Sequence, residues 1–433
     1  MKKKVPVVRV ATHDVAAQLP QTAEIALAGI AATMREGLLA FTTAAGLAVF
    51  RALLDNELVE LIGPKHAKQP EGRIGNWHGT TPGQVVLGGR KVTVERPRGR
   101  FVDGRGEIGS ATWDAFAADD LLAQVVVERM LAGVATRRHV DVAEPVGKTV
   151  KARSVSKSAV SRRFIEATET AMAELLSRDL SALDVAVLMI DGVHFADECL
   201  VVALLITSDG TKIPVGLAHG DTENAVVVKT VLADLVARGL NTDNGLLVVL
   251  DGSKALRKAV NSVFGDNAVV QRCTLHKRRN VTGHLPKTMR ATIDRRLASA
   301  FADIDPTVGL RKANLLAKEL ELAYPDAAAS LREGLDEMFT VARIGAGPTL
   351  RRSLTTTNPI ESMISIARTT TGHVKNWRDG AMRKRWAAVG MLEAERTFRR
   401  LKGHRELAAF TNKLRAQVKR KTVTRPEYTH TAA

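Results

Sequence analysis

Two apolar stretches that each end in an Asp-Gly pair decide the fold: Leu188-Met189-Ile190-Asp191-Gly192 and Leu247-Val248-Val249-Leu250-Asp251-Gly252. A short aliphatic run that stops at a turn signal predicts a buried strand, so each Asp is expected at the last position of its strand. In α/β folds this edge of the sheet is where ligands bind. If the two strands are parallel neighbours, the carboxylates emerge side by side and repel each other unless a cation such as Mg²⁺ lies between them. Gly192 and Gly252 leave room for a phosphate backbone to approach.

The composition indicates a polyanionic partner. The chain has 433 residues, with 63 Lys and Arg against 46 Asp and Glu, and a formal net charge of +17. Such an excess favours DNA or RNA over an acidic protein. Aromatic residues make up only 4% of the chain, which argues against a stacking platform for unpaired bases and favours double-stranded DNA held through its phosphates. The only cysteines, Cys199 and Cys273, are too few for a disulfide framework, so we expect a reducing cytoplasm.

The N-terminal part of the chain divides into a helical region and a β-hairpin region. Residues 1–70 are expected to be helical, and the charges that interrupt residues 23–61 exclude a membrane span there. Within residues 71–118, two apolar runs around Gly88-Gly89 predict a hairpin. A Pro- and Gly-containing loop is expected to follow, and its basic residues either contact DNA phosphates or are simply solvated; they are Arg96, Arg98 and Arg100.

Residues 119–180 have the layout of a helix-turn-helix. Periodic segments at 119–132 and 136–142 predict two helices, and a third helix is expected to open with polar and basic residues. A recognition helix contacts a DNA groove with such an N-terminal end, although bundles that bind nothing share the pattern. The candidate DNA-contacting residues here are Ser156, Lys157, Arg162 and Arg163.

From residue 181 the pattern becomes α/β. Strands are expected at 185–191, 199–207 and 212–219, joined by short turns that imply an antiparallel meander. A helix at 224–238, the strand ending at Asp251, a helix at 254–264 and a strand at 268–271 follow. This is the strand order of an RNase H-like domain, which we assign to residues 181–280. The remaining regions are an all-helical insertion (281–350), C-terminal helices of the catalytic core (351–410, within one helical region from 359 to 417) and a basic tail (411–433) that is expected to be disordered from Lys419.

A third carboxylate, Glu361, lies in the segment Thr355-Thr356-Thr357-Asn358-Pro359-Ile360-Glu361-Ser362. Asn358 is the expected N-cap of a helix and Pro359 its first residue, which places Glu361 at the third position. Helix rules alone therefore favour a capping box between Asn358 and Glu361. Its place after the α/β core makes Glu361 a competing candidate for a third metal-binding carboxylate.

Taken together and in order, these motifs resemble those of the mutator-type bacterial insertion-sequence transposases. The resemblance rests on Asp191-Gly192, Asp251-Gly252, the run from Gln271 to Asn280 and the segment from Thr357 to Ser362, and it spans residues 75 to 405. Residues 1–70 match no part of the family pattern. The two aspartates are 60 residues apart, and Asp251 and Glu361 are 110 apart. The resemblance implies a DDE triad of Asp191, Asp251 and Glu361 on an RNase H-like fold interrupted by a helical insertion, with two Mg²⁺ or Mn²⁺ ions.

Cys273 and His276 match the Cys-x-x-His element of that family. Zinc prefers such ligands but needs four of them, so the shortage favours a structural or active-site-supporting pair. The neighbouring basic residues are candidates for phosphate contacts, namely Lys277, Arg278 and Arg279. After the Glu, a further basic stretch is expected to bind DNA, consisting of Arg368, Lys375, Trp377 and Arg378. Trp377 either stacks on a flipped base or packs inside the protein.

The sequence thus predicts a DDE transposase that binds the inverted-repeat ends of an insertion sequence as a homodimer, nicks them and joins them to target DNA. One alternative is a structure-selective nuclease or resolvase on the same fold. The other is a transposase-derived DNA-binding protein without catalytic activity.

Overall fold

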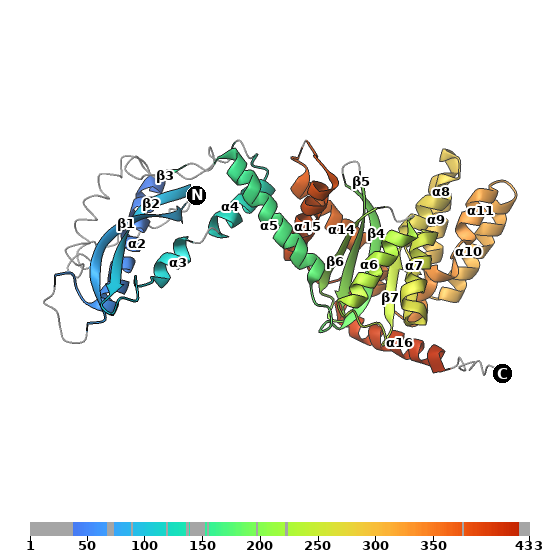
Figure 1. Ribbon diagram of the computed structural model, residues 1–433. Helices are drawn as coiled ribbons and strands as arrows, with labels where there is room; N and C mark the ends of the chain where they lie inside the picture. The colour runs from blue at the N-terminus through green and yellow to red at the C-terminus, as the bar shows by residue number, and fades with distance from the viewer. Residues whose placement is uncertain are drawn as a thin grey trace, which may run out of the picture. The chain divides into compact units, whose positions relative to one another are not determined.

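The computed structural model of the protein contains two units, Met1–Ala167 and Thr168–Ala433 (Figure 1). It describes residues 38–66, 73–87, 90–117, 120–135, 138, 152–153, 156–195, 198–220, 224–374 and 376–423. The unit boundary falls within the region that the sequence assigned to a helix-turn-helix. Most of the second helix expected there, 136–142, lies outside the described residues.

The first unit is built around a β-hairpin on which one long helix packs. Apolar residues of α2, among them Phe50 and Leu54, form a buried cluster with Val85, Val92 and Val94 of the hairpin. The predicted hairpin is therefore confirmed, while its Gly88-Gly89 turn lies outside the described residues. The elements of this unit are α2 (Leu38–Ile62), β1 (Gly75–Leu87), β2 (Arg90–Phe101), α3 (Ala111–Ala117), α4 (Asp120–Leu131), β3 (Ala152–Arg153) and the start of α5 (Lys157–Ser177).

The predicted basic loop after this hairpin is wrong. Arg96, Arg98 and Arg100 lie on β2, which continues to Phe101 because β1 pairs with it over the whole length. Pro97 is compatible with this strand because β3 pairs with β2 only near Lys91, which leaves the other edge at Pro97 without a described strand partner.

The second unit contains a five-stranded sheet in the order β6-β5-β4-β7-β8. β4, β5 and β6 form an antiparallel meander, and β7 and β8 add to β4 in parallel. This confirms the predicted strands and the crossover through a helix. The strands are β4 (Val185–Phe195), β5 (Glu198–Thr207), β6 (Lys212–His219), β7 (Leu246–Leu250) and β8 (Ala268–Arg272).

The two Asp-Gly pairs differ in their position along the strands. Asp251 follows the last residue of β7 directly, as expected. Asp191 and Gly192, in contrast, lie inside β4, which continues to Phe195, so the expectation that Asp191 ends its strand is wrong. The reason is pairing with β5, which extends antiparallel from Asp191 opposite Val202 to the end of the hairpin.

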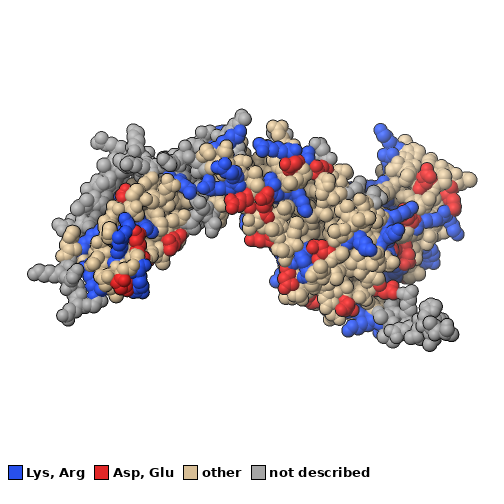
Figure 2. Space-filling view, in the orientation of Figure 1, with Lys and Arg blue, Asp and Glu red and all other residues tan. Residues whose placement is uncertain are grey.

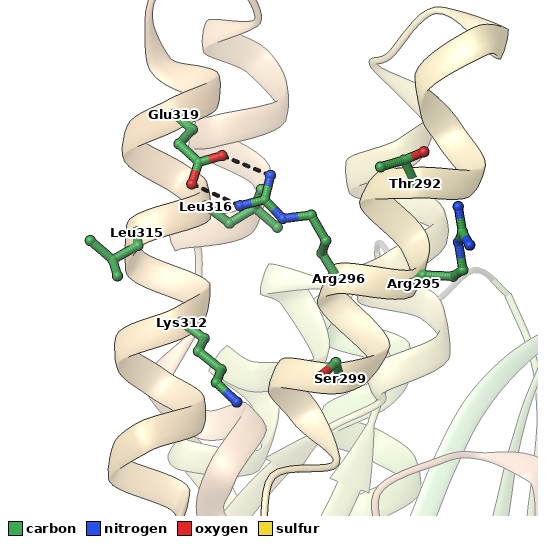
Figure 3. Close-up of a pocket in the computed structure, with 8 residues that line it drawn as sticks. All are labelled: Thr292, Arg295, Arg296, Ser299, Lys312, Leu315, Leu316 and Glu319. Atoms are coloured by element: carbon green, nitrogen blue, oxygen red, sulfur yellow. Dashed lines mark hydrogen bonds and ion pairs between the residues drawn. The ribbon is translucent and has the colours of Figure 1, made fainter.

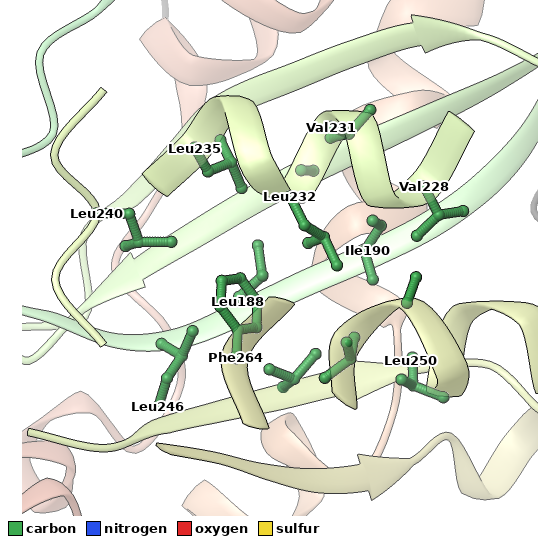
Figure 4. Packing of buried hydrophobic residues seen from close by; sticks show 14 of the residues in the cluster. Leu188, Ile190, Val228, Val231, Leu232, Leu235, Leu240, Leu246, Leu250 and Phe264 are labelled. Atoms are coloured by element: carbon green, nitrogen blue, oxygen red, sulfur yellow. The ribbon is translucent and has the colours of Figure 1, made fainter. Parts of the chain in front are cut away.

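The main core lies between the sheet and helices α6 (Ala225–Ala237) and α7 (Lys254–Phe264). Figure 4 shows Leu188 and Ile190 of β4 facing Leu232 and Phe264 of these helices. C-terminal helices, drawn in faint red, lie behind the sheet in this view. Because both faces are covered, β4 is a continuous apolar run and not an alternating one. Each fully buried aliphatic side chain of this kind contributes about 1.5–3 kcal/mol to the free energy of unfolding.

Helices make up the rest of the second unit. The region predicted to be an all-helical insertion, 281–350, contains helices and no strand. Three of the helices here begin at prolines, as expected for a residue that fits the first helical turn, and α9 begins directly after Pro286. These elements are α8 (Thr274–Gly283), α9 (Lys287–Phe301), α10 (Pro306–Glu321), α11 (Pro325–Arg332), η4 (Asp336–Phe339), α12 (Thr340–Ile344) and α13 (Pro348–Leu354); a short η3 (Gly265–Asn267) precedes β8.

The C-terminal region corrects one expectation. The helical region predicted from 359 to 417 consists of three helices, and the chain leaves the first after Thr371 and begins the next with Asp379 as N-cap. The last helix continues to Val423, so the first residues of the tail that was expected to be disordered from Lys419 are helical. The three helices are α14 (Asn358–Thr371), α15 (Gly380–Thr397) and α16 (His404–Val423). No helix in the described part of the chain has both the length and the apolar character needed to cross a bilayer.

Candidate active site

Parallel pairing of β4 with β7 brings the two aspartates together. The register joins Val187 to Leu247 and Met189 to Val249, an offset of 60 residues that also separates Asp191 from Asp251. The Asp191 carboxylate accepts a hydrogen bond from the Gly192 amide at 2.9 Å. The Asp251 carboxylate accepts one from the Ser253 amide at 2.8 Å. The parallel register and the charge interaction between the two carboxyl groups place Asp191 and Asp251 near each other on neighbouring strands.

The environment of Asp191 favours a protonated or cation-bound carboxyl group. Only 6% of the residue is exposed. Burial and, secondarily, the negative charge of Asp251 raise the pKa of Asp191 from 3.8 to about 7, although the charge of His276 acts in the opposite direction. A buried carboxyl group with a like-charged neighbour is a common feature of functional sites.

His276, in the first turn of α8, provides a positive charge beside these acids. Its hydrogen bond with Cys273 raises the pKa of His276 to about 9, and the charges of Asp191 and Asp251 act in the same direction. Burial would raise the pKa of the Cys273 thiol, but hydrogen bonds with His276 and Thr357 outweigh burial and lower it. Cys273 and His276 thus form a hydrogen-bonded pair next to the acidic site.

Glu361 joins this group through Thr357. The Thr357 hydroxyl donates to Glu361 Oε1 at 3.2 Å and lies 3.4 Å from His276 Nδ1. Glu361 Oε1 is 3.8 Å from His276 Nε2. The predicted capping box is absent, because Thr357 occupies the N-cap position and Asn358 is the first helical residue. The side chain of Glu361 therefore faces the acidic site and does not cap its own helix.

The residues present fit a divalent cation in part. Asp191 and Asp251 offer the hard oxygen donors that Mg²⁺ and Mn²⁺ prefer, and burial together with the charge of Asp251 raises the pKa of Asp191, so a cation beside it would be favourable. In the described ranges, however, no three His, Cys, Asp or Glu side chains are grouped so that they could hold a metal. Glu361, the expected third ligand, is bonded to Thr357. Asp191 and Asp251 therefore lie near each other, whereas Glu361 does not complete a three-carboxylate metal site with them.

A cavity of about 340 Å³ opens beside Asp251. Its walls combine the carboxylates of Asp251 and Glu333 with the donors of Lys254, His276 and Asn280. The Lys254 side chain is 84% exposed and only 3.9 Å from Glu333. Among the described residues, the Asn280 side chain has no hydrogen-bond partner. The unpaired Asn280 amide and the loosely paired Lys254 ammonium thus face the space next to Asp251.

A second cavity, of about 440 Å³, lies between α9 and α10 of the insertion. Figure 3 shows Arg296 reaching from α9 to Glu319 on α10. Glu319 is the single carboxylate that lines this cavity, and it is already paired with Arg296. The chemistry that the aspartate pair offers is absent from this cavity.

The basic run on α8 separates into buried and exposed residues. Lys277 is buried and donates to the carbonyl oxygens of Ser330 and Glu333 at 2.6 and 2.7 Å, so its predicted phosphate contact is wrong. Burial also lowers the pKa of Lys277 to about 8. Arg278 forms an ion pair with Asp294 on α9. Only Arg279 is exposed and without a partner among the described residues.

The residues after Glu361 hold the tip of the β4–β5 hairpin. Arg368 donates to the carbonyl oxygen of His194 at 2.8 Å. The Trp377 ring packs edge-on against Phe195, with ring centroids 5.4 Å apart, which matches the packing alternative for this Trp. Arg378 is exposed, and Lys375 lies outside the described residues.

In the first unit, Arg96 and Arg98 form ion pairs with Glu107, which leaves Arg100 as the exposed member of this group. Ser156 caps α5 by accepting a hydrogen bond from the Ala159 amide at 3.2 Å. Lys157 and Arg162 are exposed, and Arg163 is partly buried.

On the face drawn in Figure 2, Lys and Arg side chains are interspersed with Asp and Glu. The net charge of +17 therefore does not single out a binding surface on that face.

Some site residues were not identified from the sequence. Lys254 follows the Asp251-Gly252-Ser253 turn, but nothing in its local pattern distinguishes it from any exposed Lys. Arg272, Asn280 and Thr357 are part of the motif segments, yet their roles depend on partners that are distant in sequence.

Comparison with known proteins places this site in a family. The family model described as "Transposase, Mutator family" matches residues 21–390, so the match begins well inside the region that was expected to match nothing. The chain is 33% identical over 202 residues to the transposase for insertion sequence element IS6120 of Mycolicibacterium smegmatis, covering 44% of this chain and 60% of that protein. It is 28% identical over 178 residues to the transposase for insertion sequence element IST2 of Acidithiobacillus ferrooxidans, covering 41% and 59%.

A longer match, 26% identical over 280 residues, links the chain to the transposase for insertion sequence element IS905 of Lactococcus lactis, with 63% of this chain and 68% of that protein covered. The matches to the first two relatives span about three fifths of their lengths. Because the family model covers residues 21–390 of 433, this protein belongs to the Mutator family of transposases.

Proposed function

We propose that the protein is the transposase of an insertion sequence and that it acts on double-stranded DNA. It would nick the DNA at the inverted-repeat ends of its element and join the freed 3′ ends to target DNA. The observation that carries this proposal is the pairing of Asp191 with Asp251 at the β4–β7 junction of a chain whose relatives are named as transposases. The sheet order, three antiparallel strands followed by two parallel ones, supports an RNase H-like catalytic domain.

Asp191, Asp251 and Glu361 are the proposed catalytic carboxylates, and they would hold two Mg²⁺ or Mn²⁺ ions. When bound, such ions lower the pKa of a water molecule and offset the charge of the phosphate under attack. Glu361 would exchange its bond with Thr357 for a place in this ligand set. The His276 imidazolium, held by Cys273 and Thr357, would offset the acidic charge near the phosphate.

DNA would bind beside Asp251 through donors that are unpaired or only loosely paired. Lys254 and Asn280 line the cavity next to Asp251, and the exposed Arg279 precedes Asn280 on α8. These side chains suit the phosphates of the cleaved strand. In the first unit, Arg100, Lys157 and Arg162 are the exposed candidates for contacts with the terminal repeats. Transposition joins two ends, for which a homodimer would provide two active sites.

Glu361→Gln tests this assignment. We expect it to abolish strand transfer from a pre-nicked duplex that carries the terminal repeat, with unchanged affinity for that duplex. Glu393→Gln, which removes a partly exposed carboxylate paired with Arg396 on α15, is the control and should retain activity. Strand transfer by Glu361→Gln at the wild-type rate would reduce Glu361 to a structural partner of Thr357.

The same assay separates the alternatives. A structure-selective nuclease or resolvase on this fold would cleave the duplex without joining the pre-nicked end. A transposase-derived DNA-binding protein would bind the duplex and do neither, with or without Mg²⁺.

A further inference from the structure

We propose that Arg272 is a positioning residue for Asp251 and that the helical insertion holds Arg272 in place through Glu337. The inference concerns the carboxylate to which we assign catalysis, so its functional part rests on the proposed transposase activity. Its structural part, an Arg that fixes the backbone beside Asp251, does not.

Arg272 reaches from the end of β8 to the peptide that follows Asp251. It is the last residue of β8 and pairs with Leu250 at the end of β7. Its side chain is only 8% exposed. Nη1 donates to the carbonyl oxygen of Gly252 at 3.3 Å, and the Cys273 amide donates to the Leu250 carbonyl at 2.8 Å. The backbone is thus held on both sides of Asp251.

The insertion supplies the charge that compensates this buried guanidinium. Glu337, on η4, accepts from Arg272 Nε at 2.7 Å and from Arg257 Nε at 2.6 Å. Gly334 lies against the guanidinium with a φ of +60°, and a Cβ at this position would overlap it. Glu333 Oε1 lies 3.8 Å from Arg272 Nη1, so loss of Glu337 would leave the buried guanidinium with only this longer contact and would loosen its bond to Gly252.

This arrangement gives Asp251 two anchors. Its own carboxylate accepts from the Ser253 amide at 2.8 Å, and the carbonyl between these residues accepts from Arg272. Without the second anchor, the Asp251-Gly252-Ser253 turn would sample other conformations, and the distance to Asp191 would no longer be fixed. Through Glu337, the insertion contributes to the geometry of the acidic pair although it provides neither of the two aspartates.

Hydrogen–deuterium exchange of the full-length protein, without DNA or metal, tests the structural part. In Arg272→Gln and in the milder Glu337→Gln, we expect the peptide containing the Ser253 amide to exchange about tenfold faster. Arg178→Gln is the matched control, since Arg178 forms a bidentate pair with Glu395 and donates to the Pro214 carbonyl, away from Asp251. Unchanged exchange in both variants, or an equal increase in the control, would overturn the proposal.

Strand transfer from a pre-nicked terminal-repeat duplex tests the positioning role. At saturating DNA, Arg272→Gln should lower the rate about tenfold with unchanged DNA affinity, and Arg272→Lys should recover part of the rate. Faster exchange combined with a wild-type rate would show that the bond does not position Asp251. If the wild-type protein itself transfers no strand, the proposed function fails, while the exchange measurement still decides whether Arg272 and Glu337 hold the turn.

Discussion

The two Asp-Gly pairs are identical in sequence and different in structure. Asp191-Gly192 lies inside a strand that is hydrogen-bonded on both sides, and Asp191 is 6% exposed. Asp251-Gly252 follows a strand end and lines an open cavity of about 340 Å³. The same dipeptide therefore provides a buried carboxyl group whose pKa is raised to about 7 and a half-buried one that faces the cavity.

This difference indicates that the two aspartates have different roles. Asp191 is held rigidly by the sheet, and its charge is unfavourable until a cation or a proton arrives. Asp251 lies in a turn whose position depends on Ser253 and Arg272. In the absence of metal, changes at Asp191 should thus alter stability more than changes at Asp251, whereas the loss of either carboxylate should impair catalysis.

The largest expected effect is the loss of catalysis in Asp251→Asn. Removal of one metal-binding carboxylate should lower the strand-transfer rate on the order of a thousandfold, which corresponds to about 4 kcal/mol in activation free energy. The affinity for terminal-repeat DNA, measured by fluorescence anisotropy, should stay unchanged. Asp243→Asn, at an exposed turn before β7, should retain the wild-type rate. A rate within tenfold of wild type for Asp251→Asn would remove this residue from the catalytic set.

Asp191→Asn should stabilise the protein at high pH in the absence of metal. The pKa of Asp191 is about 7 in the folded state and 3.8 as the reference value, so the folded state binds the proton more tightly. Stability is therefore lost as the pH rises from about 4 to about 7, up to about 4 kcal/mol, and the loss is complete above that range. The free energy of unfolding of the variant should not show this loss. Urea unfolding of both proteins at pH 5 and pH 8 measures the difference, and identical pH dependence in both proteins would contradict the prediction.

Mg²⁺ should stabilise the wild-type protein through both aspartates. At pH 8, a Mg²⁺ concentration ten times its dissociation constant would add about 1.4 kcal/mol to the free energy of unfolding. Thermal unfolding with MgCl₂, against NaCl at equal ionic strength, provides the measurement. Asp191→Asn and Asp251→Asn should each lose the response, whereas Asp243→Asn should keep it. An equal shift in all four proteins would assign the effect to other sites.

The smallest expected effect is that of Gly252→Ala. A Cβ at this position would lie 3.4 Å from Asn280 Nδ2, and the backbone there does not need glycine. Stability should change by less than about 0.5 kcal/mol, while the narrower cavity should slow strand transfer about twofold to threefold. Gly283→Ala, whose Cβ would meet no atom within 4 Å, is the control for both measurements. A faster reaction in Gly252→Ala would show that the cavity wall is not in contact with DNA.

Local sequence patterns were sufficient to predict the strands and their order. The apolar runs of β4, β5 and β7 are long and end at clear turn signals, because strands covered on both faces need continuous apolar sequence. The prolines at the first positions of α10 and α11 fit a helix start for an equally local reason. The placement of Asp191 beside Asp251 followed from two such strands being parallel neighbours.

The wrong predictions concern positions whose structure is determined by partners that are distant in the sequence. β4 continues past Asp191 because β5 pairs with it, and Arg96 and Arg98 lie on a strand because β1 does the same for β2. Lys277 looks like its exposed neighbour Arg279, yet it binds carbonyl oxygens at the end of α11.

The sequence by itself determined which residues are available for chemistry: two aspartates after apolar strands, a Cys-His pair and a Glu in the first turn of a helix. Only the tertiary structure decided how they are used. The exposure, charge compensation and hydrogen-bond partners of these side chains depend on segments that lie far apart in the sequence, some by more than a hundred residues. It buried Asp191 against β5, turned Glu361 toward Thr357 and His276, and connected Arg272 to Glu337 of the insertion. The physical reason is that the energy of a carboxylate is set by the groups around it, and the chain brings those groups together only when it folds.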